Sequence, residues 1–366
     1  MKARLRQDLE ALMLIPGLSG HEDRVRHWIA MRLAEDGIAA RSDRMGNLIA
    51  TFEGDPARPS VMVFAHMDQL GFVVRKIEAD GLIRVERLGG VPERALASQP
   101  VLLCVEGGED VAGIIANKSH HATSPEEKYE VLRVPDLRID TGHGSKEAVE
   151  AAGIAIGTPV VYRPHVLPLA GDRVAGTSVD DRAGCAVLIE LARALADRTG
   201  GPRVHLVFST QEEFNLRGAV VAAQGLRPDI AIQIDLMLAT DTPDMEERGE
   251  MRLGGGPGIS LYSFHGRGTL NGVIPHPSAV RLFEGAAAAE GQPLQRGAQV
   301  GVLTDLSYVQ FVGEGVVAID AGFPMRYSHS SLEMVDLGDL EALTRLLIAA
   351  LARIGPDFPL TRDGAA

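Results

Sequence analysis

Carboxylate and imidazole side chains occur at five places along this chain where an apolar run ends or a helix should begin. They are His66 and Asp68, Asp180 and Asp181, Glu212 and Glu213, Asp235, and His329. In open α/β sheets, ligand sites lie beyond the carboxyl ends of the strands, so we expect these side chains to face one site. Acids gathered on one rim repel one another unless cations neutralise them. Imidazoles combined with carboxylates suit zinc or another borderline transition metal, whereas oxygen ligands alone would indicate magnesium or calcium.

Each of these residues also has a simpler explanation. A single histidine at a strand end is more often a hydrogen-bonded rim residue than a ligand, and Asp180 or Asp181 could cap the helix that follows. Glu212 and Glu213 could be a solvated pair, and Asp235 could be a turn residue. These explanations treat the residues one at a time, and none of them accounts for acids from several segments at one rim.

The elements that must position these residues alternate between strands and helices. Apolar runs that should form strands buried on both faces occupy residues 61–65, 204–209, 230–234 and 315–320. Residues 183–197, AGCAVLIELARALAD, have helical periodicity, as do residues 19–36, where Ser19 and Glu22 could form a capping box. The pattern predicts an α/β fold with a mostly parallel central sheet flanked by helices.

The pattern changes between about residues 71 and 165, where short alternating segments are punctuated by glycine and proline. We predict a small β-barrel-like domain over residues 71–165, inserted between two parts of the α/β domain, residues 1–70 and 166–366. Within the insertion, residues 118–130 are polar and should form an exposed loop. The histidines of this loop, His120 and His121, are expected to be solvated. A second hypothesis is that the loop reaches an active-site mouth, its own or a neighbour's.

The composition limits the classes of function. A formal net charge of −13 over 366 residues would repel phosphate backbones, so nucleic acid is not an expected partner. Hydrophobic residues make up 45% of the chain and charged residues 23%, which is typical of a globular protein, and no apolar stretch is long enough to predict a membrane span. Two distant cysteines, Cys104 and Cys185, and an N-terminus unlike a signal peptide predict a cytoplasmic location.

Six segments, in this order, resemble the family-forty-two metallopeptidases, which include the tetrahedral aminopeptidases and the glutamyl aminopeptidases. The segments are AHMDQLGF, TSVDDRAGCAV, STQEEFNLRGA, IAIQIDLMLATDTP, GVLTDLSYV and RYSHSSLEMV. The resemblance covers nearly the whole chain, and the inserted segment looks like the family's β-rich dimerisation domain. The chain departs from the family at Gln69, where an acidic residue is common, and at Val302 and Leu303, where two glycines are more frequent.

The resemblance implies two groups of metal ligands that share one aspartate. They are His66, Asp180 and Asp235 for one ion, and Asp180, Glu213 and His329 for the other. Glu212 would act as the general base, and Asp68 would orient the imidazole of His66.

The resemblance and the strand geometry also predict the backbone at the site. Related co-catalytic peptidases have a cis peptide bond after the bridging aspartate, so we expect one between Asp180 and Asp181. Successive residues of a strand point in opposite directions, so Glu212 and Glu213 can face one site only if the chain bends there. We therefore predict a bend over residues 211–216.

These roles predict a metal-dependent aminopeptidase that removes N-terminal residues from short peptides. Two divalent metal ions per subunit, zinc first with cobalt or manganese as alternatives, would activate a shared water. The expected partners are peptides with a free N-terminus and other copies of the chain, because the resemblance implies dimers that commonly assemble into a tetrahedral dodecamer. Two other functions stay open, a metal-dependent amidohydrolase acting on N-acyl amino acids or small amides, and a metal-binding protein without catalysis. A glycoside hydrolase is disfavoured, because 4% aromatic residues supply few sugar-stacking side chains.

Overall fold

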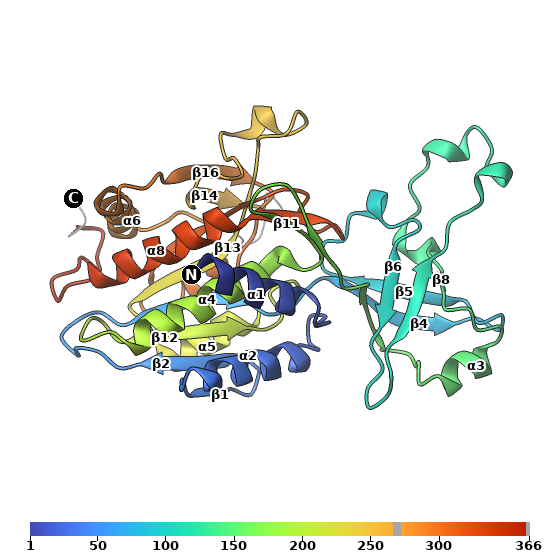
Figure 1. Cartoon of the computed structure of the whole chain (residues 1–366), viewed down its shortest axis with the longest axis horizontal. Coiled ribbons are helices and arrows are strands. Elements are labelled where there is room, and N and C mark those ends of the chain that lie inside the picture. The colour runs from blue at the N-terminus through green and yellow to red at the C-terminus, as the bar shows by residue number, and fades with distance from the viewer. Residues whose placement is uncertain (266–271, 364–366) are drawn as a thin grey trace.

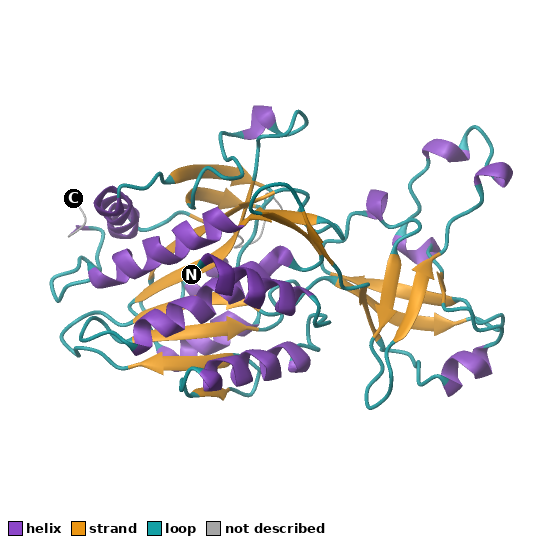
Figure 2. Ribbon diagram, in the orientation of Figure 1, coloured by secondary structure: helices purple, strands orange, loops and turns teal. Residues whose placement is uncertain are grey.

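The structure is a computed structural model of the chain that describes residues 1–265 and 272–363. An α/β part contains the N-terminus and the C-terminal helix, and a smaller β-rich part lies at the other end of the long axis (Figure 1, Figure 2). The two parts are joined by the chain on either side of the β-rich part, as an insertion requires.

The central sheet of the α/β part is parallel in its middle. Its strands follow the order β1 (Ala40–Ser42), β2 (Leu48–Phe52), β12 (Val204–Ser209), β3 (Val61–His66), β13 (Ile230–Leu238), β17 (Val317–Met325), β14 (Gly258–Phe264) and β15 (Gly272–Val273), with β16 (Gln295–Val300) paired to β14. Strands β12, β3, β13 and β17 are parallel to one another, whereas β1, β2, β14 and β15 join the sheet antiparallel. The predicted α/β class is confirmed, and the antiparallel pairs lie toward the sheet's edges.

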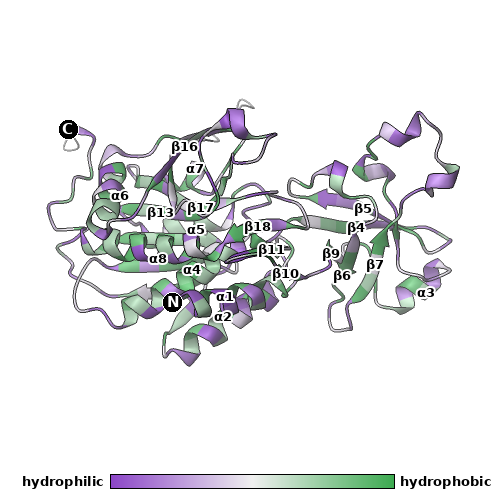
Figure 3. Ribbon diagram, turned by 45° about the horizontal axis from the view of Figure 1, so that its top comes forward, coloured by the Kyte–Doolittle hydropathy of each residue, from purple (hydrophilic) through white to green (hydrophobic). Residues whose placement is uncertain are grey.

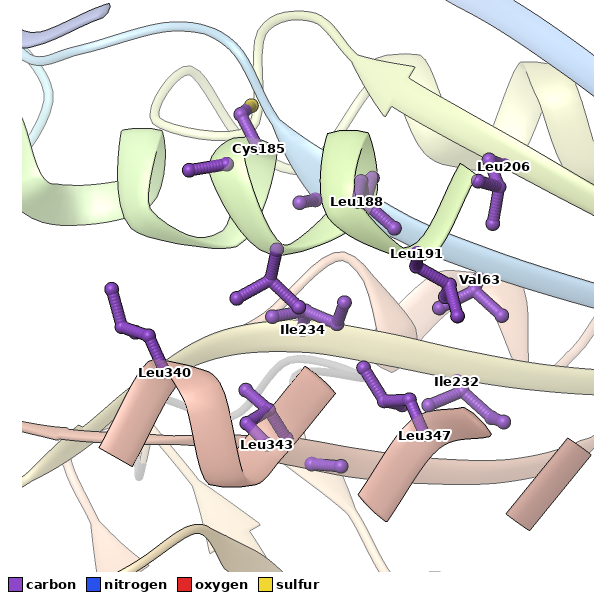
Figure 4. Packing of buried hydrophobic residues seen from close by; sticks show 14 of the residues in the cluster. Val63, Cys185, Leu188, Leu191, Leu206, Ile232, Ile234, Leu340, Leu343 and Leu347 are labelled. Carbon is purple, nitrogen blue, oxygen red and sulfur yellow. The ribbon is translucent and has the colours of Figure 1, made fainter. Parts of the chain in front are cut away.

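Helices cover both faces of this sheet. One face is covered by α1 (Lys2–Met13), α2 (Asp23–Glu35), α4 (Val179–Ala196), α6 (Pro277–Glu290) and α8 (Leu337–Ala352), and the other by α5 (Gly218–Leu226) and α7 (Leu306–Val309). Because side chains alternate along a strand, β13 sends Ile232 and Ile234 to the first face and Ala231 to the second. Leucines of α4 and α8 pack around these two isoleucines, as Figure 4 shows.

The β-rich part is a closed antiparallel barrel with its own hydrophobic core. Its strands follow the order β4 (Gly71–Ile77), β5 (Ile83–Leu88), β8 (Ile139–Asp140), β7 (Val111–Ile115), β6 (Pro100–Leu103) and β9 (Pro159–Tyr162), and α3 (Lys146–Ala151) lies beside them. Side chains such as Phe72, Val85 and Val101 fill the barrel and form a cluster separate from the core of the α/β part. Apolar strand residues are visible in both parts in Figure 3.

Short elements complete the fold. A small antiparallel sheet consists of β10 (Val166–Pro168), β11 (Arg173–Gly176) and β18 (Glu333–Asp336), and short 3-10 helices occupy Glu93–Ala95 (η1), His120–Ala122 (η2), Glu127–Tyr129 (η3), Val134–Asp136 (η4) and Glu246–Arg248 (η5). Strand β11 leads into α4, and β18 leads into α8. The small sheet therefore fixes the entry of two helices that flank the central sheet. Within the described residues, none of the helices has both the length and the apolar character needed to cross a bilayer.

The capping box predicted for α2 is wrong. The helix begins at Asp23, and neither Ser19 nor Glu22 caps it through a side chain. The buried carboxylate of Glu22 instead accepts hydrogen bonds from the backbone N–H groups of Gly20, at 2.7 Å, and Gln211, at 3.0 Å. Glu22 thus joins the start of α2 to the loop that follows β12, a contact between segments almost 190 residues apart.

An ion-pair network fixes α4 against the two N-terminal helices. Asp8 of α1 and Glu190 of α4 are buried, and the guanidinium of Arg193 lies 3.0 Å from Asp8 and 2.8 Å from Glu190. Arg32 of α2 approaches Asp8 to 2.8 Å, so the acids are paired with cations from more than one helix. Buried charges need such partners because desolvation is costly. The network holds α4 in place, and the first turn of α4 contains Asp180.

Candidate active site

The candidate residues lie at the carboxyl ends of the parallel strands. His66 is the last residue of β3, Asp235 lies in the second half of β13, and Glu212 and Glu213 follow β12. Asp180 lies in the first turn of α4, and His329 follows β17. This is the rim where open α/β sheets bind ligands.

The backbone around the site departs from regular helix and strand geometry at several residues. The peptide bond between Asp180 and Asp181 is cis, which confirms that prediction. Residues 211–216 form the predicted bend between β12 and α5, and Gln211 has a φ of 56°. His329 has a φ of 67°. Non-glycine residues in this left-handed region cost on the order of 1–3 kcal/mol each and persist only when the surrounding structure holds them.

Buried glutamates supply that support. Glu22 accepts the N–H of Gln211, and Glu333 accepts the N–H of His329 at 2.7 Å. The other oxygen of Glu333 accepts the N–H of Asp180 at 3.0 Å. The carboxylate of Glu333 therefore connects the backbone of Asp180 with that of His329, which lies 149 residues further along the chain.

The first group of donors consists of His66, Asp180 and Asp235. One ligand atom from each lies within 4.8 Å of the others. His66 Nε2 is 3.1 Å from Asp180 Oδ1. On the other side of the ring, His66 Nδ1 lies 3.1 Å from the carbonyl oxygen of Asp68, which can only accept. The Nδ1 atom therefore carries a proton, and Nε2 is the ring nitrogen that faces the group of donors.

The second group consists of Asp180, Glu213 and His329, again with ligand atoms within 4.8 Å of one another. His329 Nε2 lies 3.4 Å from Asp180 Oδ2 and 3.8 Å from Glu213 Oε1. His329 Nδ1 donates to the carbonyl of Gly90, at 2.9 Å, so this ring also presents Nε2. Asp180 directs one carboxylate oxygen toward each group. The two groups of donors therefore share the carboxylate of Asp180.

The electrostatics of the site favour bound cations. Burial raises the pKa of Glu213 to about 7, and it raises the pKa values of Glu212 and Asp235 well above their ordinary range, with repulsion from neighbouring carboxylates adding to the effect. For Asp180 burial acts in the same direction, but hydrogen bonds with His329 and His66 outweigh it and lower the pKa. Two divalent cations would remove the repulsion. The donor set of two imidazoles and three carboxylates fits a dinuclear site for zinc-like metals.

Asp68 and Asp181 hold the backbone of the site. The carboxylate of Asp68 lies 3.5 Å from His66 Nδ1, but each of its oxygens accepts a backbone N–H, from Glu212 and from Glu213, both at 3.0 Å. Asp181 accepts the N–H of His66 at 3.2 Å. The two aspartates connect the ends of β3 and β12 with the start of α4.

Sequence reasoning missed several of these supporting residues. Glu333 lies in the segment RYSHSSLEMV and Gln233 lies in IAIQIDL, but the sequence pattern predicts no function for either residue. The side chain of Gln233 donates to Asp235 at 3.1 Å and accepts the N–H of Leu306 at 2.7 Å. The available signal was a polar residue inside an apolar strand run, since a polar group buried there needs partners. The identity of those partners depends on strand order.

A cleft of about 1200 Å³, counting its open mouth, gives access to both donor groups. His66, Glu212 and Asp235 line it from the α/β part, and Gly90 and Pro92 line it from the barrel part. Val302 and Leu303, two of the residues that depart from the family pattern, also line it. Gln69, the third departure, instead bonds to Gly17 through backbone and side chain.

The loop of His120 and His121 projects from the barrel part and is exposed. Figure 1 shows η2 and η3, which belong to this loop, above the barrel strands on the side away from the central sheet. Neither histidine lines the cleft of its own chain. The hypothesis that the loop reaches a neighbour's site stays a prediction.

Comparisons with known proteins agree with this architecture. The model of the M42 glutamyl aminopeptidase family matches residues 46–346. SgcX of Escherichia coli strain K12 is 37% identical over 99% of this chain and 97% of its own length. An aminopeptidase from the archaeon Desulfurococcus kamchatkensis has a solved structure with a TM-score of 0.90, 31% identity, and coverage of 98% and 97% of the two chains. The TET1 peptidase of Pyrococcus horikoshii, which can assemble into a tetrahedron or a large octahedral shell, has a TM-score of 0.85 at 29% identity, with 95% and 99% covered. The chain belongs to the M42 aminopeptidase family.

Proposed function

We propose that this protein is an aminopeptidase that removes N-terminal residues from short peptides with the help of two divalent metal ions. The observation that carries the proposal is the position of Asp180, whose two oxygens face two separate groups of donors. His66 and Asp235 would complete the first group, and Glu213 and His329 the second. Zinc is the expected metal, with cobalt or manganese as alternatives.

The metal ions would supply electrophilic chemistry, because a pair of divalent cations lowers the pKa of a water and polarises the substrate carbonyl. Glu212 would move the proton. Its carboxylate lines the cleft, belongs to neither group of donors, and has an oxygen 4.0 Å from His66 Nε2. It can therefore accept the proton of the attacking water and deliver it to the leaving amine. Asp68 keeps Glu212 and Glu213 in these different roles by fixing the backbone of both.

Chelation and metal addition test the reaction. We expect the purified protein to release amino acids from free peptides but not from N-acetylated ones, to lose this activity after treatment with a chelator, and to regain it with added zinc, cobalt or manganese. Released amino acids are quantified by chromatography, and bound metal by mass spectrometry. Cleavage of N-acylated amino acids would support the amidohydrolase instead, and full metal loading with no cleavage would support a binding protein.

We further propose that the barrel part forms dimers and that six dimers assemble into a tetrahedral dodecamer. The structural similarity to TET1 supports this proposal. Large apolar side chains on the barrel part are also exposed, among them Ile114 and Ile156, with 56% and 72% of their surfaces accessible. Light scattering after size exclusion should give twelve times the 39.0 kDa mass of one chain. A mass of 39.0 kDa across a wide concentration range would contradict the proposal.

A further inference from the structure

A second, smaller pocket lies next to the cleft, beside the first donor group. It adjoins the cleft, since Asp235, Leu236, Leu238 and Val302 line both. The space measures about 440 Å³ when open solvent at its mouth is counted, and its enclosed part is narrow. A peptide whose reacting carbonyl lay at the metal ligands would have its N-terminal side chain beside this opening.

The pocket contains a buried carboxylate that is only partly satisfied. Asp320 of β17 is 4% exposed, and its Oδ1 accepts a hydrogen bond from Thr304 at 2.9 Å. Its Oδ2 atom is buried and has no hydrogen-bond partner. Burial raises the pKa of Asp320 to about 7. Nearly all buried polar atoms in proteins have partners, so an unpartnered oxygen in the wall of a pocket points to a ligand that supplies the donor.

A hydroxyl in the same pocket is also unpartnered. Ser263 of β14 is 4% exposed, and its buried Oγ has no hydrogen-bond partner. Met237 and Met251 form apolar parts of the pocket wall. Their unbranched thioether side chains can adapt to a flexible alkyl chain. The pocket thus combines an apolar passage with a carboxylate oxygen and a hydroxyl oxygen.

The charges of the lining determine which side chain it can accept. Asp235 and Asp320 are its charged residues, and no lysine, arginine or histidine is found among the described residues that line it. An acidic side chain would face repulsion, and an apolar one would leave Asp320 Oδ2 without a donor. A ligand that leaves buried polar groups of its site unpaired is rejected by a much larger factor than a ligand that only lacks a methylene group.

We propose that this pocket receives the N-terminal side chain of the substrate and that Asp320, assisted by Ser263, selects side chains that end in a cation, such as that of lysine. The inference rests on the proposed function, because it uses the orientation of a peptide at the metal ligands. It adds the class of residue that is removed. Asp320 would bind the ammonium group directly and would take no part in moving the reacting proton.

Amino-acid binding to the metal-loaded protein tests the selection without requiring catalysis. Calorimetric titration compares L-lysine with L-norleucine, which has the same carbon chain but no side-chain ammonium, and with L-glutamate. We expect lysine to bind at least about 30-fold more tightly than norleucine, the lower end of what a buried charge partner contributes. Glutamate should bind more weakly than either. In Asp320→Asn the preference for lysine over norleucine should fall to a few-fold.

Controls keep the outcomes distinct. Glu314→Gln removes the same charge from an exposed position just before β17 and should keep the lysine preference of the unmodified protein. If Asp320→Asn does not fold, the unmodified protein still decides, because equal binding of lysine and norleucine would overturn the inference. Peptides beginning with lysine or leucine are assayed in parallel. Cleavage of both at equal kcat/KM would overturn the pocket assignment and leave the peptidase in place, whereas Asp320-dependent lysine binding without peptide cleavage would overturn the peptidase alone.

Discussion

Replacing Glu212 with glutamine is expected to lower kcat for peptide hydrolysis by about 10²–10⁴-fold, the usual contribution of a general acid–base group. Glutamine has nearly the same shape but cannot accept the proton of the attacking water. Because Glu212 belongs to neither group of donors, both metal ions should stay bound. The measurements are steady-state kinetics with a free peptide and metal content by mass spectrometry.

The neighbouring residue provides the matched control. Glu213 has one of its oxygens 3.8 Å from His329 Nε2, within the second donor group. Glu213→Gln should therefore lose metal from that group, whereas Glu212→Gln should not. Two adjacent glutamates with opposite responses would separate proton transfer from metal binding. Wild-type activity in Glu212→Gln would refute the assignment of the general base.

Replacing Asp180 with alanine should remove both metal ions and at least about 10³-fold of the activity, because metal ions contribute several kcal/mol of transition-state stabilisation. The physical reason is that Asp180 directs one oxygen to each group, 3.1 Å from His66 Nε2 and 3.4 Å from His329 Nε2. A residue that belongs to one group only should have a smaller effect on metal content. His329→Ala is expected to lose one ion and keep the other.

Metal content per chain, measured after dialysis against a fixed free-metal concentration, distinguishes these outcomes. Asp172→Ala serves as the control, because Asp172 is an exposed aspartate paired with Lys2 and should leave metal content unchanged. The folded state of each variant is checked by circular dichroism. Retention of two ions in Asp180→Ala would show that the aspartate does not bridge, and the dinuclear proposal would have to be abandoned.

Much of the fold follows from patterns that are local in the chain. The apolar runs predict β3, β12, β13 and β17, because a strand buried on both faces must be apolar throughout. Most of the predicted strand ends lie within a few residues of the observed ones. The main error in length is at β13 and β17, which continue to Leu238 and Met325. They continue through residues that the patterns treat as polar or as turn formers, because burial in the sheet outweighs local preference.

The candidate ligands were also accessible from the sequence, since each lies next to the end of a recognisable strand or the start of a helix. Strand polarity brings such positions to one rim whatever the order of the strands. The chemistry of acids crowded at a rim then indicates cations. The resemblance to co-catalytic peptidases predicted the cis bond after Asp180, and the alternation of side chains along a strand predicted the bend after β12.

Contacts between distant segments depend on the folded chain. Glu333 binds the backbone of Asp180 and His329, and Asp68 binds the backbone of Glu212 and Glu213, across separations of up to 153 residues. The pocket of Asp320 lies where the four strands β13, β14, β16 and β17 meet the segments that contain Met251, Val302 and Thr304. A hydrogen bond needs two atoms within about 3 Å of each other. Residue type and spacing establish which groups require partners, but the order of strands in the sheet and the packing of loops on its rim establish which partners they obtain.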